Sequence, residues 1–65
     1  MQTNEIRLIR LPAVRELTGL SRASIYSYIS GGTFPRPACL GGRAVAWVHS
    51  EVQQWIADRV AARSK

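Results

Sequence analysis

The fold of this chain is decided by one stretch of its sequence, Leu17-Thr18-Gly19-Leu20-Ser21-Arg22-Ala23-Ser24-Ile25-Tyr26-Ser27-Tyr28-Ile29. Gly19 suits the left-handed conformation that ends a helix, and Leu20 can supply the hydrophobic contact that accompanies such an end. Ser21 can accept a hydrogen bond from the first free N–H groups of a following helix. The stretch therefore predicts two helices joined by a tight turn.

Upstream of this turn, the sequence predicts a short helix and an extended segment. The first helix should begin near Pro12, because proline has a fixed φ and no N–H to leave unpaired in a first turn. Val14 and Leu17 are three residues apart and should both face the core. Residues 6–9 alternate loosely and should lie extended against the body. Residues 1–5 are polar and are expected to be flexible.

The second helix has two contrasting faces. Ile25 and Ile29, with Tyr28 beside them, form the predicted buried stripe. The opposite face carries Ala23, Ser27 and Ser30, flanked by Ser24 and Tyr26. A helix surface that serves only solubility would carry Glu and Lys. We interpret this low, uncharged face as one that approaches another surface closely, either the base edges of DNA or a second subunit.

A β-hairpin is predicted after the second helix ends at Gly31 and Gly32, with Phe34 as a core residue in the connection. Gly41 and Gly42 should form the hairpin loop, because both central residues of some hairpin turns need positive φ. This register pairs Leu40 with Arg43 and places Arg43 beside the tip. Period-two alternation then directs one set of side chains to the core, namely Ala38, Leu40, Val45 and Trp47. The other set points outward and comprises Cys39, Ala44 and Ala46.

A third helix is predicted from residue 50 onward. Ser50 and Gln53 have the spacing of a capping box. Its apolar positions recur at helical spacing and are Val52, Trp55, Ile56 and Val60. Trp47 and Trp55 are interpreted as core anchors. Residues 63–65 are expected to form a flexible tail, which leaves one domain over residues 6–62.

Composition favours an anionic partner. The formal net charge is +5 with a sequence pI near 10.8, and every basic residue except Lys65 is arginine, the side chain best suited to forked contacts with phosphate and guanine. One cysteine excludes an intramolecular disulfide and favours a reducing compartment. Neither a bilayer-spanning run nor a secretory signal is apparent. We expect a cytoplasmic, nucleoid-associated protein with no membrane partner.

Catalytic and metal chemistry find little support in the sequence. Cys39 and the single histidine, His49, supply too few ligands for a metal site. Glu16 and Glu51 are interpreted as helix-surface charges. We therefore expect no enzyme activity, no cofactor and no small-molecule substrate.

Several segments, in this order, resemble the AlpA-like family of phage and prophage regulators, which is related to excisionases and to the DNA-binding heads of MerR-type proteins. The segments are Arg10-Leu11-Pro12, Thr18-Gly19-Leu20-Ser21-Arg22, Ile25-Tyr26, Gly31 with Phe34-Pro35-Arg36-Pro37, Leu40-Gly41-Gly42-Arg43-Ala44-Val45-Ala46-Trp47, and Ser50-Glu51-Val52 leading to Trp55-Ile56. The resemblance covers roughly residues 7–61. It implies a mainly α fold with a small β-hairpin, a winged helix-turn-helix, and sequence-directed DNA binding.

The resemblance also assigns roles to residues. The recognition-helix residues are Ser21, Arg22, Ala23, Ser24, Tyr26 and Ser27. Gly42 and Arg43 belong to the wing, and Arg10 and Arg36 are further candidates for phosphate contacts. Relatives often carry a basic residue at the positions of Ser27 and Cys39, so this chain departs from the family pattern there.

The predicted function is sequence-specific binding of double-stranded DNA by a phage- or prophage-type transcriptional regulator, with further copies of itself on adjacent sites. An excisionase-like factor that bends attachment-site DNA is the first alternative. A small adaptor for an integrase or polymerase is the second. A single-strand binder would need exposed aromatic residues on a sheet, whereas both tryptophans are expected to face inward.

Overall fold

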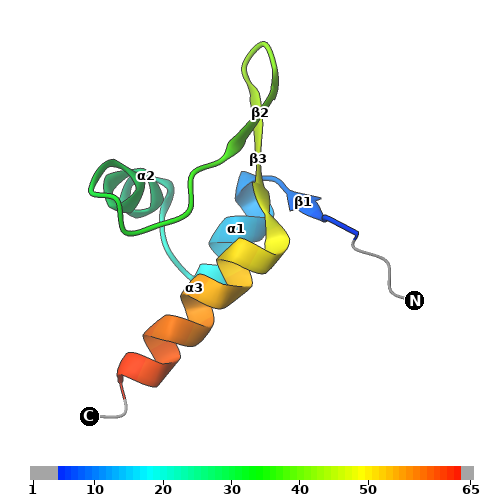
Figure 1. The fold of residues 1–65 in the computed structure, drawn as a ribbon. Helices are drawn as coiled ribbons and strands as arrows, with labels where there is room; N and C mark the ends of the chain where they lie inside the picture. Colours follow the sequence, from blue (N-terminus) through cyan, green and yellow to red (C-terminus); the bar gives the residue numbers. More distant parts are fainter. Residues whose placement is uncertain (1–4, 64–65) are drawn as a thin grey trace.

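Residues 5–63 form three helices and a small three-stranded antiparallel sheet, and this part of the chain is mostly helical (Figure 1). A computed structural model describes residues 5–63. The predictions for residues 1–4 and for residues 64 and 65 lie outside this range. The elements in chain order are β1 (Leu8–Ile9), α1 (Leu11–Thr18), α2 (Arg22–Ser30), β2 (Ala38–Gly41), β3 (Ala44–Val48) and α3 (His49–Ala62).

The predicted helix–turn–helix unit is confirmed. Helix α1 ends at Thr18, and Gly19 follows with a φ of 74° while its N–H donates to the Arg15 carbonyl at 2.8 Å. The Ser21 side chain caps α2 by accepting a hydrogen bond from the Ser24 N–H at 3.1 Å. Because Gly19 reverses the chain at once, α2 begins only three positions further along.

The extended segment upstream of α1 is also confirmed, and it adds a third strand to the hairpin. Strand β1 pairs antiparallel with β3 through Leu8 opposite Val48 and Ile9 opposite Trp47. The sheet order is β1-β3-β2, so β3 is the central strand. This pairing fixes the chain leading into α1 against the strand that carries the largest core residue.

The hairpin is present, but its predicted register is wrong. Gly41 lies opposite Ala44, and Cys39 lies opposite Val45, with an irregularity between Cys39 and Gly41 that leaves Leu40 without a partner. The turn residues are therefore Gly42 and Arg43. Gly42 has a φ of 55° and Gly41 a φ of 132°, whereas no other residue type in the described chain has positive φ. This kind of turn needs positive φ only at its first central position, which Gly42 occupies, so the second position can be an arginine. Gly41 lies at the bulge instead.

The shifted register changes which side chains are buried. Ala38 and Leu40 were expected to face the core, but all of β2 is exposed, with Leu40 at 49%. Ala46 was expected to point outward and is 1% exposed, next to Trp47 at 0%. Figure 1 shows the reason, because the hairpin extends away from the helices and only the far end of β3 lies among them.

Within the described part of the chain, the core cluster consists of Val14, Ile25, Phe34, Trp47 and Val52. Its presence confirms the predicted inward positions of these residues. Trp55 and Ile56 are partly buried against the cluster, as predicted for the inner face of α3.

Two further predicted core residues, one in α1 and one in α3, are exposed. Leu17 is 41% exposed in the last turn of α1, and Leu20 from the turn packs against the core cluster. Val60 is 50% exposed, because the C-terminal half of α3 extends beyond the body (Figure 1).

The predicted capping box of α3 is wrong. The N-cap residue is Val48, which makes no side-chain cap bond, and the helix begins at His49. Strand β3 leads directly into α3, so the chain has no loop residue to act as a cap. Instead the His49 N–H donates to the Arg7 carbonyl of the segment before β1 at 2.7 Å.

Candidate nucleic-acid interface

Helix α2 presents an exposed face of small side chains, which we call the α2 face and define as Ala23, Ser27 and Ser30. All three residues are exposed, and Ser24 beside them is half-buried. A shallow hollow on this helix is lined by Ala23, Ser24, Ser27 and Tyr28. In Figure 1, α2 lies at one side of the molecule, away from the tip of the hairpin. The predicted outward direction of this face is thus confirmed.

One border of the α2 face is formed by Tyr26 and Arg22. The Arg22 guanidinium lies over the Tyr26 ring, with its carbon 5.0 Å from the ring centroid. The Tyr26 ring in turn meets the Trp47 indole edge-on at a centroid distance of 6.2 Å. An exposed cation–π contact contributes roughly 0.5–1 kcal/mol, so Arg22 is held at the start of α2.

The other border is formed by Tyr28, which is 37% exposed instead of belonging to the buried stripe. Its ring centroid lies 6.1 Å from that of Trp55, which donates its indole N–H to the Thr33 carbonyl. Arg59 of α3 covers both rings, 5.6 Å from the Tyr28 centroid and 4.8 Å from the Trp55 centroid. A second guanidinium is therefore held beside α2, from a different helix.

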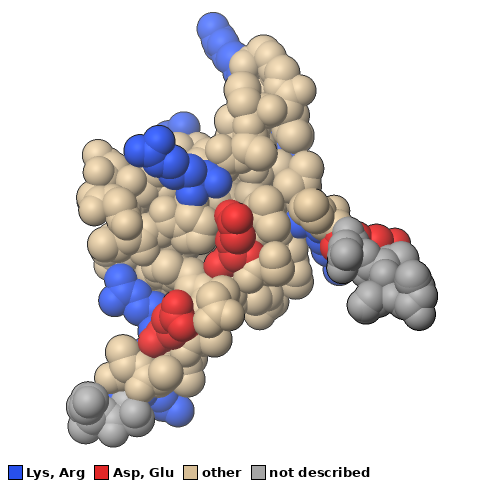
Figure 2. Space-filling model, viewed as in Figure 1, with Lys and Arg blue, Asp and Glu red and all other residues tan. Residues whose placement is uncertain are grey.

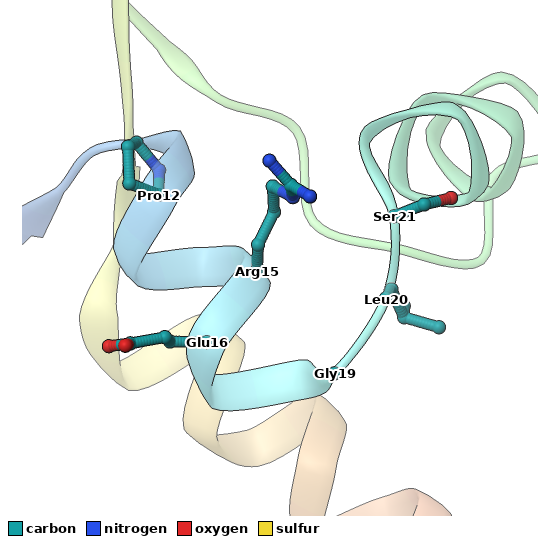
Figure 3. Close-up of a pocket in the computed structure, with 6 residues that line it drawn as sticks. All are labelled: Pro12, Arg15, Glu16, Gly19, Leu20 and Ser21. Carbon is teal, nitrogen blue, oxygen red and sulfur yellow. The ribbon is translucent and has the colours of Figure 1, made fainter.

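A further hollow lies where α1 turns into α2, and it is lined by Pro12, Arg15, Glu16, Gly19, Leu20 and Ser21. Figure 3 shows Arg15 extending from α1 toward the side where α2 begins, while Glu16 points the opposite way. The N-terminus of α2 also carries the positive end of its helix dipole. An anion at this end would meet Arg15, the dipole and the Ser21 hydroxyl together.

Charge is distributed unevenly along the chain. Residues 17–50 contain no Asp or Glu, and they include Arg22, Arg36 and Arg43, all exposed. In Figure 2, acidic and basic side chains both lie along α3, whereas around α2 and at the tip of the hairpin the charged side chains in view are basic. The segment from the turn between α1 and α2 to the end of β3 therefore carries positive charge and contains no Asp or Glu.

The remaining predicted site residues lie in separate places. Gly42 and Arg43 form the hairpin turn, and Arg10 is the exposed N-cap residue of α1. Sequence reasoning assigned no contact to Arg15 or Arg59. The spacing of Trp55 and Arg59 on one helix is a usable signal for a stacked pair, but the contribution of Tyr28 depends on tertiary packing.

Other kinds of site are not supported within residues 5–63. No three His, Cys, Asp or Glu side chains gather into a group able to hold a metal ion. No helix in this part of the chain has both the length and the apolar character that crossing a bilayer requires.

Two comparisons with known proteins agree with this geometry. Residues 7–60 match the family model of the prophage CP4-57 regulatory protein (AlpA). The chain is 51% identical over 59 residues to the uncharacterized protein ORF88 of Enterobacteria phage P4, which covers 91% of this chain and 67% of the phage protein. It is 37% identical over 60 residues to the DNA-binding transcriptional activator AlpA of Escherichia coli (strain K12), covering 83% of this chain and 86% of that protein. This chain therefore belongs to the AlpA family of prophage regulatory proteins.

Proposed function

We propose that this protein is a sequence-specific binder of double-stranded DNA that regulates transcription in a prophage setting, within the cytoplasm. The exposed α2 face, bordered by arginine and free of carboxylates, is the observation that carries the proposal. The name of the E. coli relative, a DNA-binding transcriptional activator, supports the same function. Membership of a family of regulatory proteins supports the expectation that the chain is not an enzyme.

In this proposal residues 6–62 act as one winged helix-turn-helix domain. Helix α2 is the recognition helix and enters the major groove, whose width admits one helix. Ser21 and Arg22, with backbone N–H groups at the start of α2, bind phosphate. The base edges are then read by side chains of the exposed surface, namely Ala23, Ser24, Tyr26 and Ser27.

The hairpin of β2 and β3 is the wing. Gly42 allows the tight turn, and Arg43 projects from it to contact the flanking backbone. Arg10 and Arg36 add phosphate contacts. Backbone contacts of this kind position a protein on DNA, whereas base contacts supply the sequence preference.

The test is fluorescence anisotropy with labelled duplex DNA over a series of salt concentrations. If about four to six phosphates are neutralised, log affinity should fall against log salt with a slope of about −4 to −5. Absence of binding at low ionic strength, or a signal that salt does not change, would contradict the proposal. Retention of an integrase or polymerase after nuclease treatment, with no shift of duplex DNA, would instead support the adaptor alternative.

The regulatory role has its own test. Genomic fragments captured by the purified protein should share a short motif located at promoters. Location of the motif at attachment sites would favour the excision alternative. Because so small a domain reads few base pairs, we expect tandem sites to bind more tightly than one isolated site, through copies on adjacent sites.

A further inference from the structure

Arg59 has no role in the interface described so far, and its position suggests one. We propose that Arg59 contacts a DNA phosphate on the side of α2 opposite Arg22, so that α2 is held between the two strands that border the major groove. This inference rests on the proposed function and adds a residue from α3 to the interface.

The helical positions of the two tyrosines support this arrangement. Tyr26 and Tyr28 are two residues apart and point about 200° apart around the helix axis, with Ser27 between them. Each ring carries one guanidinium, Arg22 over Tyr26 and Arg59 over Tyr28. The α2 face is thus bordered on both sides by a tyrosine and an arginine.

The stacking restricts where the Arg59 guanidinium can lie. Arg59 covers Tyr28 and Trp55 together, and Trp55 is itself fixed by packing against Phe34 at a centroid distance of 4.8 Å. A side chain held on a fixed platform loses less conformational entropy when it binds. Stacking also leaves the guanidinium edges free to donate hydrogen bonds to an anion.

The dimensions of a helix and of the major groove indicate that Arg59 would meet a phosphate and not a base. A helix with side chains is about 10–12 Å across, and the major groove is about 12 Å wide. A helix in the groove therefore has a phosphate strand at each side. Arg59 comes from a neighbouring helix and lies beside the α2 face, where the backbone passes, and not on the surface that meets base edges.

A structural role for Arg59 is the competing explanation, because its two ring contacts also join α3 to α2. The experiment must therefore separate charge from packing. Three variants serve this purpose. Arg59→Ala removes both, Arg59→Lys keeps the charge, and Arg7→Ala removes an equal charge next to β1, on the side of the molecule opposite α2 (Figure 1).

Binding of each full-length variant to the same duplexes should be measured by anisotropy over the salt series, with thermal unfolding followed by circular dichroism. Arg59→Ala should weaken binding roughly tenfold, as expected for a lost hydrogen bond to a charged group. The loss should be similar on preferred and scrambled duplexes, and the salt slope should decrease in magnitude by about 0.9, the value for one phosphate. Arg59→Lys should retain the full slope and lose only severalfold affinity.

The outcomes separate the inference from the function on which it rests. If the wild-type protein does not bind duplex DNA, the proposed function fails. If the wild type binds with the expected slope but Arg59→Ala matches Arg7→Ala in affinity and slope, the inference on Arg59 fails alone. Weaker binding of Arg59→Ala with an unchanged slope, together with a lower unfolding temperature, would assign Arg59 a structural role and also overturn the inference.

Discussion

The Tyr26 ring contacts the buried indole of Trp47 edge-on, with centroids 6.2 Å apart and ring planes at 69°. This contact links the exposed part of α2 to the central strand of the sheet. Tyr26 is 36% exposed and also lies beneath the Arg22 guanidinium. One side chain thus supports the helix and positions its first arginine, and these two roles can be separated by mutation.

Replacement of Tyr26 should distinguish its ring from its hydroxyl. Tyr26→Phe keeps both ring contacts, so the free energy of unfolding should change by no more than about 0.5 kcal/mol. Tyr26→Ala loses both contacts and should cost about 1–2 kcal/mol, measured by urea denaturation. If the hydroxyl contacts DNA, Tyr26→Phe should still weaken binding to the preferred site several-fold. Equal binding by Tyr26→Phe and the wild type would limit Tyr26 to its structural role.

Arg22 and Arg43 should differ in their effect on sequence preference. Arg22 lies over the ring of Tyr26, a proposed base-reading residue. Besides removing one phosphate contact, Arg22→Ala should free this ring and so reduce the ratio of affinities for preferred and scrambled duplexes. Arg43 lies in the hairpin turn, so Arg43→Ala should weaken binding to both duplexes equally. It should also reduce the magnitude of the salt slope by about 0.9. Anisotropy titrations on both duplexes measure this. Negligible effects of both substitutions would contradict the docking arrangement.

The turn between α1 and α2 should depend on the conformation of Gly19. Gly19 has a φ of 74°, and an added Cβ would meet no atom within 4 Å, so Gly19→Ala is disfavoured by backbone strain alone. The cost should be about 1 kcal/mol. Gly31→Ala is the matched control, because Gly31 has a φ of −82° and its added Cβ would lie 3.6 Å from the Ser27 carbonyl oxygen, an ordinary contact. The unfolding temperature of Gly31→Ala should equal or exceed that of the wild type.

The two tryptophans should differ in their contribution to stability. Trp47 is fully buried and donates its indole N–H to the Pro35 carbonyl at 3.1 Å. Trp47→Phe leaves a cavity and an unpaired carbonyl, at a cost of about 2–4 kcal/mol, which is a large share of the stability of so small a domain. Trp55→Phe, at a partly exposed position, should cost less. Chemical denaturation of both variants gives the comparison, and a larger loss at Trp55 would contradict this view of the core.

Local signals predicted the elements of the fold well. Gly19 and Ser21 act through their own backbone and side-chain chemistry, so the turn and the α2 cap could be derived without knowledge of the rest of the molecule. The outward face of α2 followed from helical periodicity in the same way. These features involve interactions only a few residues apart, which sequence patterns record directly.

Features that depend on where elements meet could not be derived. The hairpin register was wrong because a glycine pair is compatible with more than one turn, and the bulge at Leu40 decides between them. Ser50 and Gln53 have the spacing of a capping box, but β3, which pairs with β1, continues directly into α3. Ser50 therefore lies inside the helix and not at its cap. Val60 lies at helical spacing from the inward-facing residues of α3, but the core does not extend as far as the turn of the helix that contains it.

The amino-acid sequence alone determined the two-helix unit, its small exposed face and the positive charge of the chain, because each depends on residue type and short-range periodicity. The tertiary structure alone decided that Trp47 supports Tyr26 and that Arg59 lies over Tyr28 beside α2. Those contacts join residues far apart in sequence, and they arise only when the sheet and α3 pack around a common core.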